Sequence, residues 1–223
     1  MNLHLFVEGQ SEEVFVNQVI APYLLSFNIF TDCRCVQTSF DIKTGRKYKG
    51  GLGSYIKFKR EICVALNQFT SSQERFSTFI DLYGLPSSFP AYNIAKQATT
   101  GIQQVKILEE AISKDLHDNR VIPYIQLYEF ETIILCEPQK LSLAYINNSS
   151  KIQKLIKSIA GMEPEEINNG AATAPSKRIK RFIPEYNKVF ATSQVTPNIE
   201  LSLIRKRCPH FNEWLTKLEA IGK

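Results

Sequence analysis

Two carboxylates stand at the ends of apolar segments, and a glycine follows each of them. Glu8 ends the run LHLFVE just before Gly9, and Asp81 ends the run RFSTFID three residues before Gly84. Parallel strands bring their carboxyl ends to one edge of a sheet, where ligands bind in such folds. Two carboxylates at neighbouring strand ends repel each other unless a cation lies between them, and hard oxygen ligands suit Mg²⁺ or Mn²⁺. Alternatively, each carboxylate only solvates or caps the start of a loop.

A second pair of carboxylates, Glu129 and Glu131, lies in the apolar stretch QLYEFETIIL. Apolar neighbours imply partial burial, and a buried carboxylate needs a partner. A metal ion would supply one, and so would an Arg or Lys in an ordinary salt bridge. In a strand, residues 129 and 131 share a face, so we expect one cation to contact both.

The segment APSKRIKR (174–181) begins with a proline and then carries four cations in five residues. We expect Ser176 to cap a short helix here. Lys177 and Arg178 are candidates for holding a phosphate, with Lys180 and Arg181 beside them, because Arg offers a fork of donors and Lys a point charge. The alternative is a solvated basic helix face.

Charge is unevenly distributed along the 223 residues. Residues 1–139 carry 13 Lys and Arg against 15 Asp and Glu, a net −2, whereas residues 140–223 carry 14 against 7, a net +7. A basic second half next to candidate metal-binding carboxylates suits a protein that holds a polyanion beside a cation site. A solvated helical surface would have the same composition. The Gly- and Lys-rich segment 43–55 is expected to be a mobile loop whose Lys47 and Lys49 also contact phosphates.

The elements that must position these residues alternate between strand and helix. Apolar runs predict strands at 3–8, 32–40, 75–84 and 120–135, the last running into a helix start. Helical spacing predicts helices at 11–25, 55–69 and 101–116, with Glu12 and Glu13 in the first turn of the first helix, where the helix dipole favours them. This order predicts an α/β fold with a mostly parallel sheet flanked by helices. We predict a core at 1–137 and a basic, mainly helical extension at 138–223 that packs on it.

Several classes of protein and site find no support in the sequence. There is no apolar run of the ~18 residues that a membrane span needs, and MNLHLFVEG lacks the basic n-region of a signal peptide, so we expect a cytoplasmic protein. No Ser-His-Asp arrangement, P-loop or GxGxxG is present. The C-x-C pair Cys33 and Cys35 is weak evidence for zinc, and buried thiols are the better interpretation.

The opening VEGQSEE resembles the V-E-G-x-[ST]-E start of Toprim-like domains, a fold shared by topoisomerases, bacterial primases and overcoming-lysogenization-defect (OLD) nucleases. The chain resembles more closely one Toprim-like bacterial family described only as a domain of unknown function. Five blocks of that family occur here in order: VEGQSEE (7–13), DLYGLPSSFP (81–90), RVIPYIQLYEFE (120–131), PEEINNGAATAPSKRI (164–179) and IRKRCPHFNEWL (204–215).

This resemblance implies roles for individual residues. Toprim domains hold Mg²⁺ with a Glu after the first strand and a D-x-D after a later one. Glu8 matches the first ligand and Asp81 the first Asp of the D-x-D, but Tyr83 stands where the second Asp would be. Glu129 or Glu131 is our candidate for the missing carboxylate.

The resemblance also implies an activity, which is a Mg²⁺- or Mn²⁺-dependent nuclease that cleaves DNA or RNA. Lys177 would stabilise the charge that develops on the phosphate. A bacterial defence or mobile-element setting, an ATPase partner of the AAA or ABC type and an oligomeric assembly are further implications. Where the family has H-E-F-E, this chain has Tyr128 in place of the His. A non-catalytic subunit that binds nucleic acid or an ATPase is therefore the alternative, and a toxin acting on RNA or nucleotides is a third hypothesis.

Overall fold

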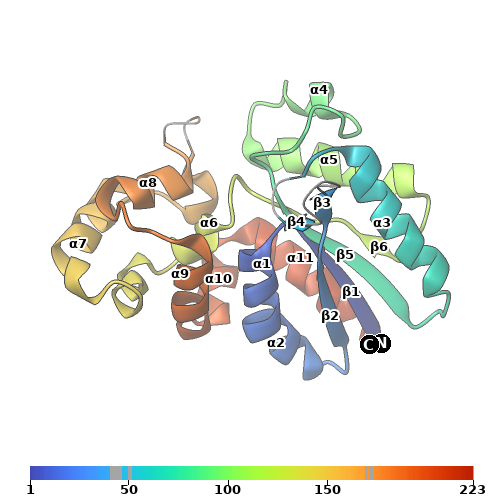
Figure 1. The fold of residues 1–223 in the computed structure, drawn as a ribbon, viewed down its shortest axis with the longest axis horizontal. Helices are drawn as coiled ribbons and strands as arrows, with labels where there is room; N and C mark the ends of the chain where they lie inside the picture. The colour runs from blue at the N-terminus through green and yellow to red at the C-terminus, as the bar shows by residue number, and fades with distance from the viewer. Residues whose placement is uncertain (41–46, 50–51, 169, 171–172, 223) are drawn as a thin grey trace.

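The computed structural model describes residues 1–40, 47–49, 52–168, 170 and 173–222. Its centre is a parallel sheet in the order β2-β1-β5-β6, with β7 also paired to β5 (Figure 1). The strands are β1 (Asn2–Val7), β2 (Phe30–Cys35), β5 (Glu74–Asp81), β6 (Val121–Ile122) and β7 (Ile125–Gln126). The expected α/β fold, with helices on both faces of a parallel sheet, is confirmed.

Helices follow the strands where the apolar spacing predicts them. Helix α3 (Tyr55–Gln68) begins at Ser54 and helix α5 (Gly101–Leu116) at Thr100, and each of these N-cap side chains accepts a hydrogen bond from a backbone N–H of the first turn. The first helical segment is continuous but uneven, because it passes from α1 (Gln10–Phe15) through a π-helical turn, η1 (Val16–Ile20), into α2 (Ala21–Leu25).

The side chains of the strands alternate between two apolar clusters. Leu3 and Leu5 of β1 face the cluster formed with α1, α2 and the C-terminal helices, whereas Phe6 faces the cluster formed with α3 and α5. Along β5, Phe79 faces the first cluster and Phe76 the second. Asp81 has the parity of Phe79, so the strand directs its side chain toward α1 and the C-terminal helices.

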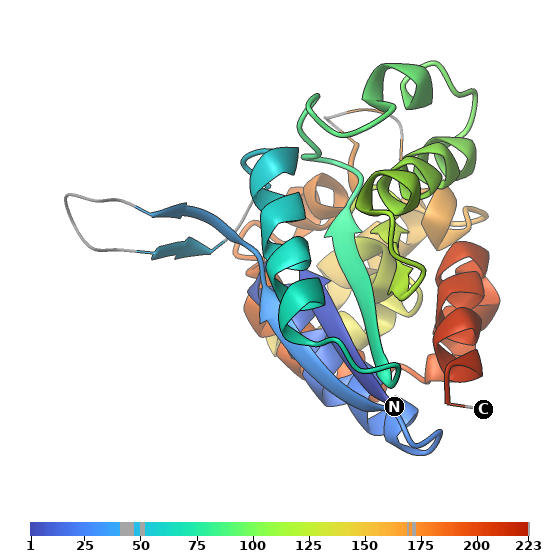
Figure 2. The same cartoon turned by 90° about the vertical axis from the view of Figure 1, so that its right-hand side faces the viewer.

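The C-terminal part is helical, as predicted, and its helices extend to one side of the sheet and also cover one of its faces (Figures 1 and 2). Its elements are η2 (Pro138–Leu143), η3 (Ile146–Asn148), α7 (Ser149–Ser158), η4 (Pro164–Glu166), α8 (Pro175–Phe182), α9 (Lys188–Val195), η5 (Thr196–Asn198), α10 (Leu201–Arg207) and α11 (Pro209–Ala220). Two short helices, α4 (Tyr92–Ala95) and α6 (Glu131–Ile134), precede this part in the chain. One buried cluster runs from β1 into these helices without a break. The boundary between residues 137 and 138 stays a prediction.

Two segments differ from expectation. The segment 43–55 is not a loop throughout: β4 (Lys47–Lys49) pairs antiparallel with β3 (Gln37–Phe40) in a hairpin that projects from the domain (Figure 2), while 41–46 and 50–51 lie outside the described residues. The strand expected at the start of 120–135 is instead two short strands, β6 and β7, on either side of Pro123, which cannot donate to a ladder, and the helix start expected after it is α6. No helix in the described part of the chain is long and apolar enough to cross a membrane.

Candidate functional site

Three carboxylates from separate elements surround the ammonium group of Lys188. Its Nζ lies 2.9 Å from Oε1 of Glu12, 3.2 Å from Oδ2 of Asp81 and 3.7 Å from Oε2 of Glu131. The three carboxylate side chains are only 3–7% exposed, and the lysine side chain is 32% exposed. The candidate site is therefore a largely buried cluster of acids around one cation.

The fold explains why these residues meet. Asp81 is the last residue of β5, Glu12 lies in the first turn of α1 and Glu131 is the first residue of α6. Lys188 begins α9, which packs against α1. Gly9, before α1, lies so close to Glu12 that a Cβ added to it would be 3.3 Å from Oε2 of that side chain. Strand ends, helix starts and a glycine turn thus converge at the carboxyl edge of the sheet.

Glu8, which directly follows β1, lies beside this cluster. Its Oε2 accepts a hydrogen bond from the backbone N–H of Asp81 at 3.1 Å, which ties the end of β1 to the end of β5. Burial raises the pKa of Glu8 to about 7, and the charges of Glu12 and Glu129 add to this effect, while the Asp81 N–H and Lys188 oppose it. Glu8 therefore holds a proton near neutral pH more readily than an ordinary glutamate.

The cluster contains more carboxyl groups than its single lysine can neutralise if all of them are ionised. Burial raises the pKa of Asp81 well above its ordinary value and also raises the pKa of Glu131, with Lys188 opposing both shifts. Burial disfavours the Lys188 ammonium, but the carboxylates of Asp81, Glu131 and Glu12 outweigh it and hold the pKa of Lys188 well above its usual range. Oδ1 of Asp81 is buried and has no hydrogen-bond partner among the described residues. The site accordingly favours added positive charge, either as protons on these carboxylates or as a cation.

The Glu129 carboxylate is hydrogen-bonded to the first turn of helix α8, and its role as a metal ligand stays a prediction. Its Oε2 accepts from the backbone N–H of Ser176 at 2.7 Å and its Oε1 from the Ser176 hydroxyl at 3.0 Å. Ser176 is thus not the cap of α8, because the N-cap residue is Ala174. The Glu129 carboxylate instead accepts the backbone N–H of Ser176 in the first turn of this helix. The expectation that Glu129 shares a strand face with Glu131 is wrong, because both residues follow β7 and Glu131 opens α6.

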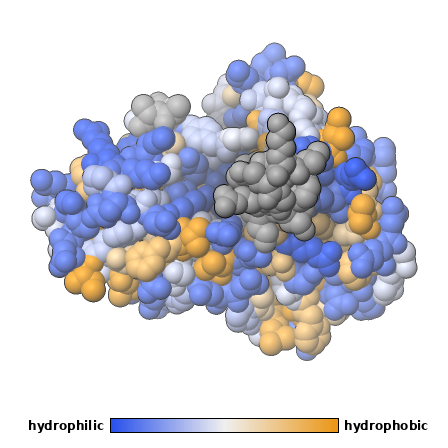
Figure 3. Space-filling view, viewed as in Figure 1, coloured by the Kyte–Doolittle hydropathy of each residue, from blue (hydrophilic) through white to orange (hydrophobic). Residues whose placement is uncertain are grey.

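Glu129 nevertheless links the acidic cluster to the basic helix α8. Lys177, Lys180 and Arg181 are exposed on this helix, whereas Arg178 is half-buried. Arg178 Nε donates to the Thr173 carbonyl at 2.8 Å. The surface over α7 and α8 is largely hydrophilic (Figure 3). Four cations therefore lie on a helix whose start is fixed beside the cluster.

Two further candidates, Lys47 and Lys49, belong to β4, but their side chains lie outside the described part of the structure. Their contact with phosphate stays a prediction.

The two tyrosines at the positions that depart from the Toprim pattern contact each other. The rings of Tyr83 and Tyr128 lie 5.5 Å apart between centroids, and the Tyr83 N–H donates to the Tyr128 carbonyl at 2.8 Å. The Tyr83 hydroxyl donates to Oδ1 of Asn168. Tyr128 adopts a left-handed backbone conformation, with φ of 63°. Tyr83 therefore presents an aromatic ring packed on Tyr128 instead of a carboxylate.

The possible metal ligands of the cluster are carboxylate oxygens, which suit a hard cation such as Mg²⁺. One of them, Oδ1 of Asp81, has no hydrogen-bond partner among the described residues. As they stand, however, no group of three or more His, Cys, Asp or Glu side chains among the described residues is arranged to hold a metal ion. Lys188 lies among those oxygens instead. The residues fit the ion in chemistry, and binding requires the Lys188 ammonium to withdraw.

Two members of the cluster are missing from the sequence-based candidates. Lys188, in EYNKVFAT, is a single lysine at a helix start and carries no spacing signature. Glu12 lies in the first turn of its helix, as expected, but its side chain is directed into the cluster and not to solvent. The sequence offers no spacing signal for this direction, because Glu8 lies before the extended N-cap Gly9 and is not on the helix.

Comparison with known proteins supports a family assignment but gives no activity. No curated protein matches the chain. The C-terminal region of the Xanthomonas campestris pv. campestris OLD protein has a similar structure, with a TM-score of 0.40 and 10% identity over 96% of each chain. The family model described as "Domain of unknown function (DUF4276)" matches residues 7–219. The chain therefore belongs to the DUF4276 family.

Proposed function

We propose that this protein is a Mg²⁺- or Mn²⁺-dependent hydrolase that cleaves phosphodiester bonds in nucleic acid. The observation that carries the proposal is the surplus of buried carboxylates around Lys188 at the carboxyl edge of the sheet. Glu12, Asp81 and Glu131 are almost fully buried, and Glu8 hydrogen-bonds to the backbone of one of them. Uncompensated buried charge is costly, and a divalent cation would stabilise this arrangement.

Each residue then has a role that its position supports. Glu12, Asp81 and Glu131 would hold the ion, with Glu8 next to them. A bound Mg²⁺ would supply charge neutralisation at the phosphate and an activated water. Lys188, once displaced from the carboxylates, would lie within reach of a bound phosphate and stabilise its developing negative charge.

The basic helix α8 would bind the nucleic acid backbone. Lys177 and Arg178 lie in its first turn, next to the residue that Glu129 holds, and Lys180 and Arg181 continue the positive surface. Contacts of this kind position a phosphate chain without recognising its sequence. Lys177 is the candidate that we assign to the phosphate under attack, with Lys47 and Lys49 as further backbone contacts.

A second candidate function is a non-catalytic subunit that binds nucleic acid or a partner. The specific observation in its favour is that Lys188 already contacts three carboxylates, as a structural ion-pair network would. Tyr83, which stands where a second Asp is expected, also favours a non-catalytic subunit. An ATPase partner of the AAA or ABC type and a defence or mobile-element setting rest on the family resemblance alone and are part of the proposal.

The test is to combine metal binding with cleavage on the same protein. Calorimetry with Mg²⁺ and Mn²⁺ is followed by incubation with single-stranded and duplex DNA and RNA, with and without metal. We expect metal binding and metal-dependent cleavage, and we expect Asp81→Asn and Glu12→Gln to lose both. Glu110→Gln is the control, because Glu110 is exposed and pairs only with Lys114 among the described residues.

Metal binding without cleavage of any substrate would favour the non-catalytic subunit. Identical metal-dependent cleavage by the wild type and by Asp81→Asn would contradict the assignment of the site.

A further inference from the structure

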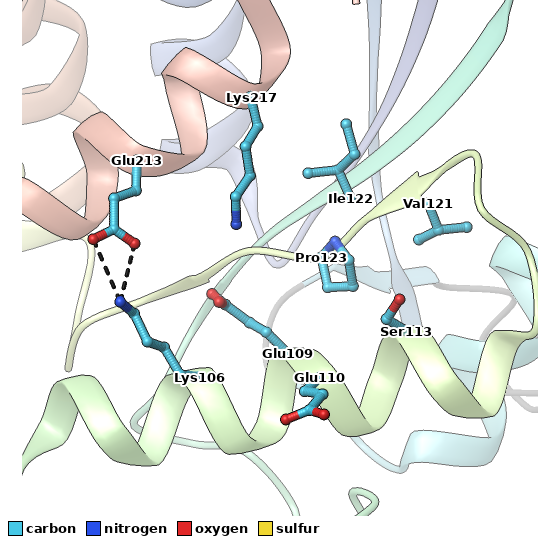
Figure 4. Close-up of a pocket in the computed structure, with 9 residues that line it drawn as sticks. All are labelled: Lys106, Glu109, Glu110, Ser113, Val121, Ile122, Pro123, Glu213 and Lys217. Carbon is cyan, nitrogen blue, oxygen red and sulfur yellow. Dashed lines mark hydrogen bonds and ion pairs between the residues drawn. The ribbon is translucent and has the colours of Figure 1, made fainter. Parts of the chain in front are cut away.

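The central sheet has two edges, and the fold protects only one of them. That edge is formed by β6 and β7, which have two residues each. Helices α5 and α11 flank β6, and Figure 4 shows charged side chains of both helices around it, with Lys106 and Glu213 paired at 3.1 Å. A short strand beside charged side chains is a poor template for another strand.

The other edge is β2, which is six residues long and pairs only with β1 in the described part of the chain. Figure 2 shows β2 as the outermost strand of the sheet, with the β3–β4 hairpin leaving from its end. Its sequence, FTDCRC, contains no proline and no lysine, the residue types that often protect a sheet edge. Its first residue, Phe30, is 62% exposed. This edge is therefore long and open to pairing.

The backbone of β2 faces β1 at every second residue. The N–H groups of Phe30 and Val36 each donate to a carbonyl of the segment 1–7 at 2.9 Å. Because the direction alternates along a strand, Thr31 and Cys33 direct their N–H and C=O groups away from β1. Among the described residues, no hydrogen-bond partner is seen for these outward groups. A further strand along β2 would supply the partners.

Two charged side chains of β2 determine which strand fits. Asp32 and Arg34 lie on the face of the sheet that Phe69 covers, with the Arg34 guanidinium 5.2 Å from the Phe69 ring centroid. They pair with each other at 2.8 Å, and their side chains are still 46% and 38% exposed. An acid and a base two residues apart are self-complementary, because an antiparallel second copy presents the same charges in reverse order.

One antiparallel register satisfies both the backbone and the charges. With β2 of a second copy centred on Cys33, the outward backbone groups of Cys33 face those of the same residue, in a hydrogen-bonded pair. Asp32 then faces Arg34 of the second copy, and Arg34 faces Asp32, in the closer non-hydrogen-bonded positions. A shift by two residues in either direction would put Asp32 opposite itself or Arg34 opposite itself. Like charges directly opposite each other are unfavourable.

We propose that a second copy of this chain pairs with β2 in this register and forms a two-fold dimer with one continuous sheet. The contact is closed, because the two-fold axis passes through Cys33 and uses the same edge of both copies. The register also places Phe30 across from Val36 of the second copy, which removes part of an exposed apolar side chain from water. The dimer is independent of the proposed hydrolase, because it uses none of the residues assigned to metal or nucleic acid.

Sedimentation velocity over a range of protein concentrations tests the dimer. We expect the average mass of the wild type to rise from that of one chain toward that of two. Arg34→Glu puts an acid opposite Asp32 twice in the dimer, and Asp32→Lys puts a base opposite Arg34 twice. Each variant alone should therefore dimerise at least about tenfold more weakly than the wild type. Arg60→Glu is the control, because it reverses an exposed charge on α3 and should leave dimerisation unchanged.

A mixture of the two variants tests the register itself. In the mixed dimer, the new acid of Arg34→Glu faces the new base of Asp32→Lys, and the remaining Asp32 faces the remaining Arg34. Fluorescence-detected sedimentation of one labelled variant with the other unlabelled measures this association. We expect the mixed dimer to form within about threefold of the wild-type affinity, because both opposite-charge pairs are restored.

Folding of the variants is checked by thermal melting, because Asp32 also contacts Nδ1 of His4 at 2.6 Å. If Asp32→Lys does not fold, Cys33→Pro replaces it, since this change removes an outward N–H and leaves the pairing with β1 intact. It should also weaken the dimer at least about tenfold.

Three results would overturn the inference. A wild type that stays monomeric at every concentration would leave this edge to a strand of a different protein. A folded Arg34→Glu variant that dimerises as tightly as the wild type would place the dimer contact elsewhere. A mixture of folded Arg34→Glu and Asp32→Lys that associates no better than either variant alone would reject the register.

Discussion

Lys188 and Asp81 are 107 positions apart in the chain, and the Lys188 ammonium donates a 3.2 Å hydrogen bond to Oδ2 of Asp81. The contact joins the start of a C-terminal helix to the end of a central strand. It places a cation where the proposed function requires a metal ion. If the Lys188 ammonium stays bound to Asp81 when metal is present, the contact is a structural ion pair. If it moves away, the carboxylates can bind a metal ion in its place.

Replacing Lys188 with Met should destabilise the metal-free protein. The substitution keeps most of the side-chain volume but leaves Glu12, Asp81 and Glu131 without their ammonium partner, and breaking a buried charge network in this way costs about 3–5 kcal/mol. Urea unfolding in EDTA measures the loss. Addition of Mg²⁺ should restore part of the stability if the carboxylates hold the ion.

The matched control is Lys217→Met, which removes an exposed lysine from α11. A loss below 1 kcal/mol for Lys188→Met, or one equal to that of Lys217→Met, would show that the cluster does not depend on its ammonium.

The stability of the metal-free protein should fall as the pH rises toward neutrality. Burial raises the pKa of Glu8 from 4.5 to about 7, so between these values the folded state binds more protons than the unfolded state. Stability then decreases with rising pH, by at most about 1.4 kcal/mol per pH unit for one group. The stabilisation of the folded state by protonated Glu8 is fully present below pH 4.5 and is lost above pH 7.

Glu8→Gln tests this assignment, because the amide cannot titrate. Urea unfolding at intervals from pH 4 to 8 should show a shallower decline for the variant than for the wild type. Parallel curves for the two proteins would mean that Glu8 does not titrate in this range, and would leave Asp81 and Glu131 as the source of any slope.

Glu129→Ala should loosen the start of α8 without removing metal binding. Its carboxylate holds the N–H and the hydroxyl of Ser176, and loss of a capping interaction costs about 0.5–2 kcal/mol. Hydrogen exchange should accelerate at the Ser176 amide, and calorimetry with Mn²⁺ should give an affinity within about threefold of the wild type. Complete loss of Mn²⁺ binding would instead make Glu129 a ligand, as the sequence pattern allows.

The paired variant Lys180→Ala with Arg181→Ala should weaken nucleic acid binding through charge alone. Both side chains are exposed on α8, so stability should change little. Each lost phosphate contact lowers the slope of log affinity against log salt by about 0.7–0.9, so the pair should lower it by roughly 1.5. Titrations at several salt concentrations measure the slope, and an unchanged slope would remove α8 from the interface.

The sheet and its helices were predictable because they depend on local periodicity. The strands around Leu5 and Phe79 and the helices capped by Ser54 and Thr100 follow the apolar pattern of the sequence. The prediction of one continuous strand around Pro123 was wrong, because it followed the apolar character of the segment and not the proline, which cannot donate to a ladder.

The site was only partly predictable, because it is built from long-range contacts. Glu8 and Asp81 come together, as expected for ends of adjacent parallel strands. The Lys188 contact depends on how α9 packs on α1, which no spacing rule encodes. Glu129 lies close in sequence to Glu131, yet a left-handed residue at Tyr128 precedes it and its side chain serves another helix.

The most direct measurement is anomalous diffraction from a crystal of the protein soaked in Mn²⁺. The proposed function predicts a peak within about 2.0–2.2 Å of carboxylate oxygens of Asp81 and Glu12, the distance range of small hard cations. It also predicts that Lys188 Nζ has moved away from Oδ2 of Asp81. A structure at saturating Mn²⁺ with no peak in the cluster, and with the ammonium of Lys188 still bound to Asp81, would contradict the metal-dependent hydrolase.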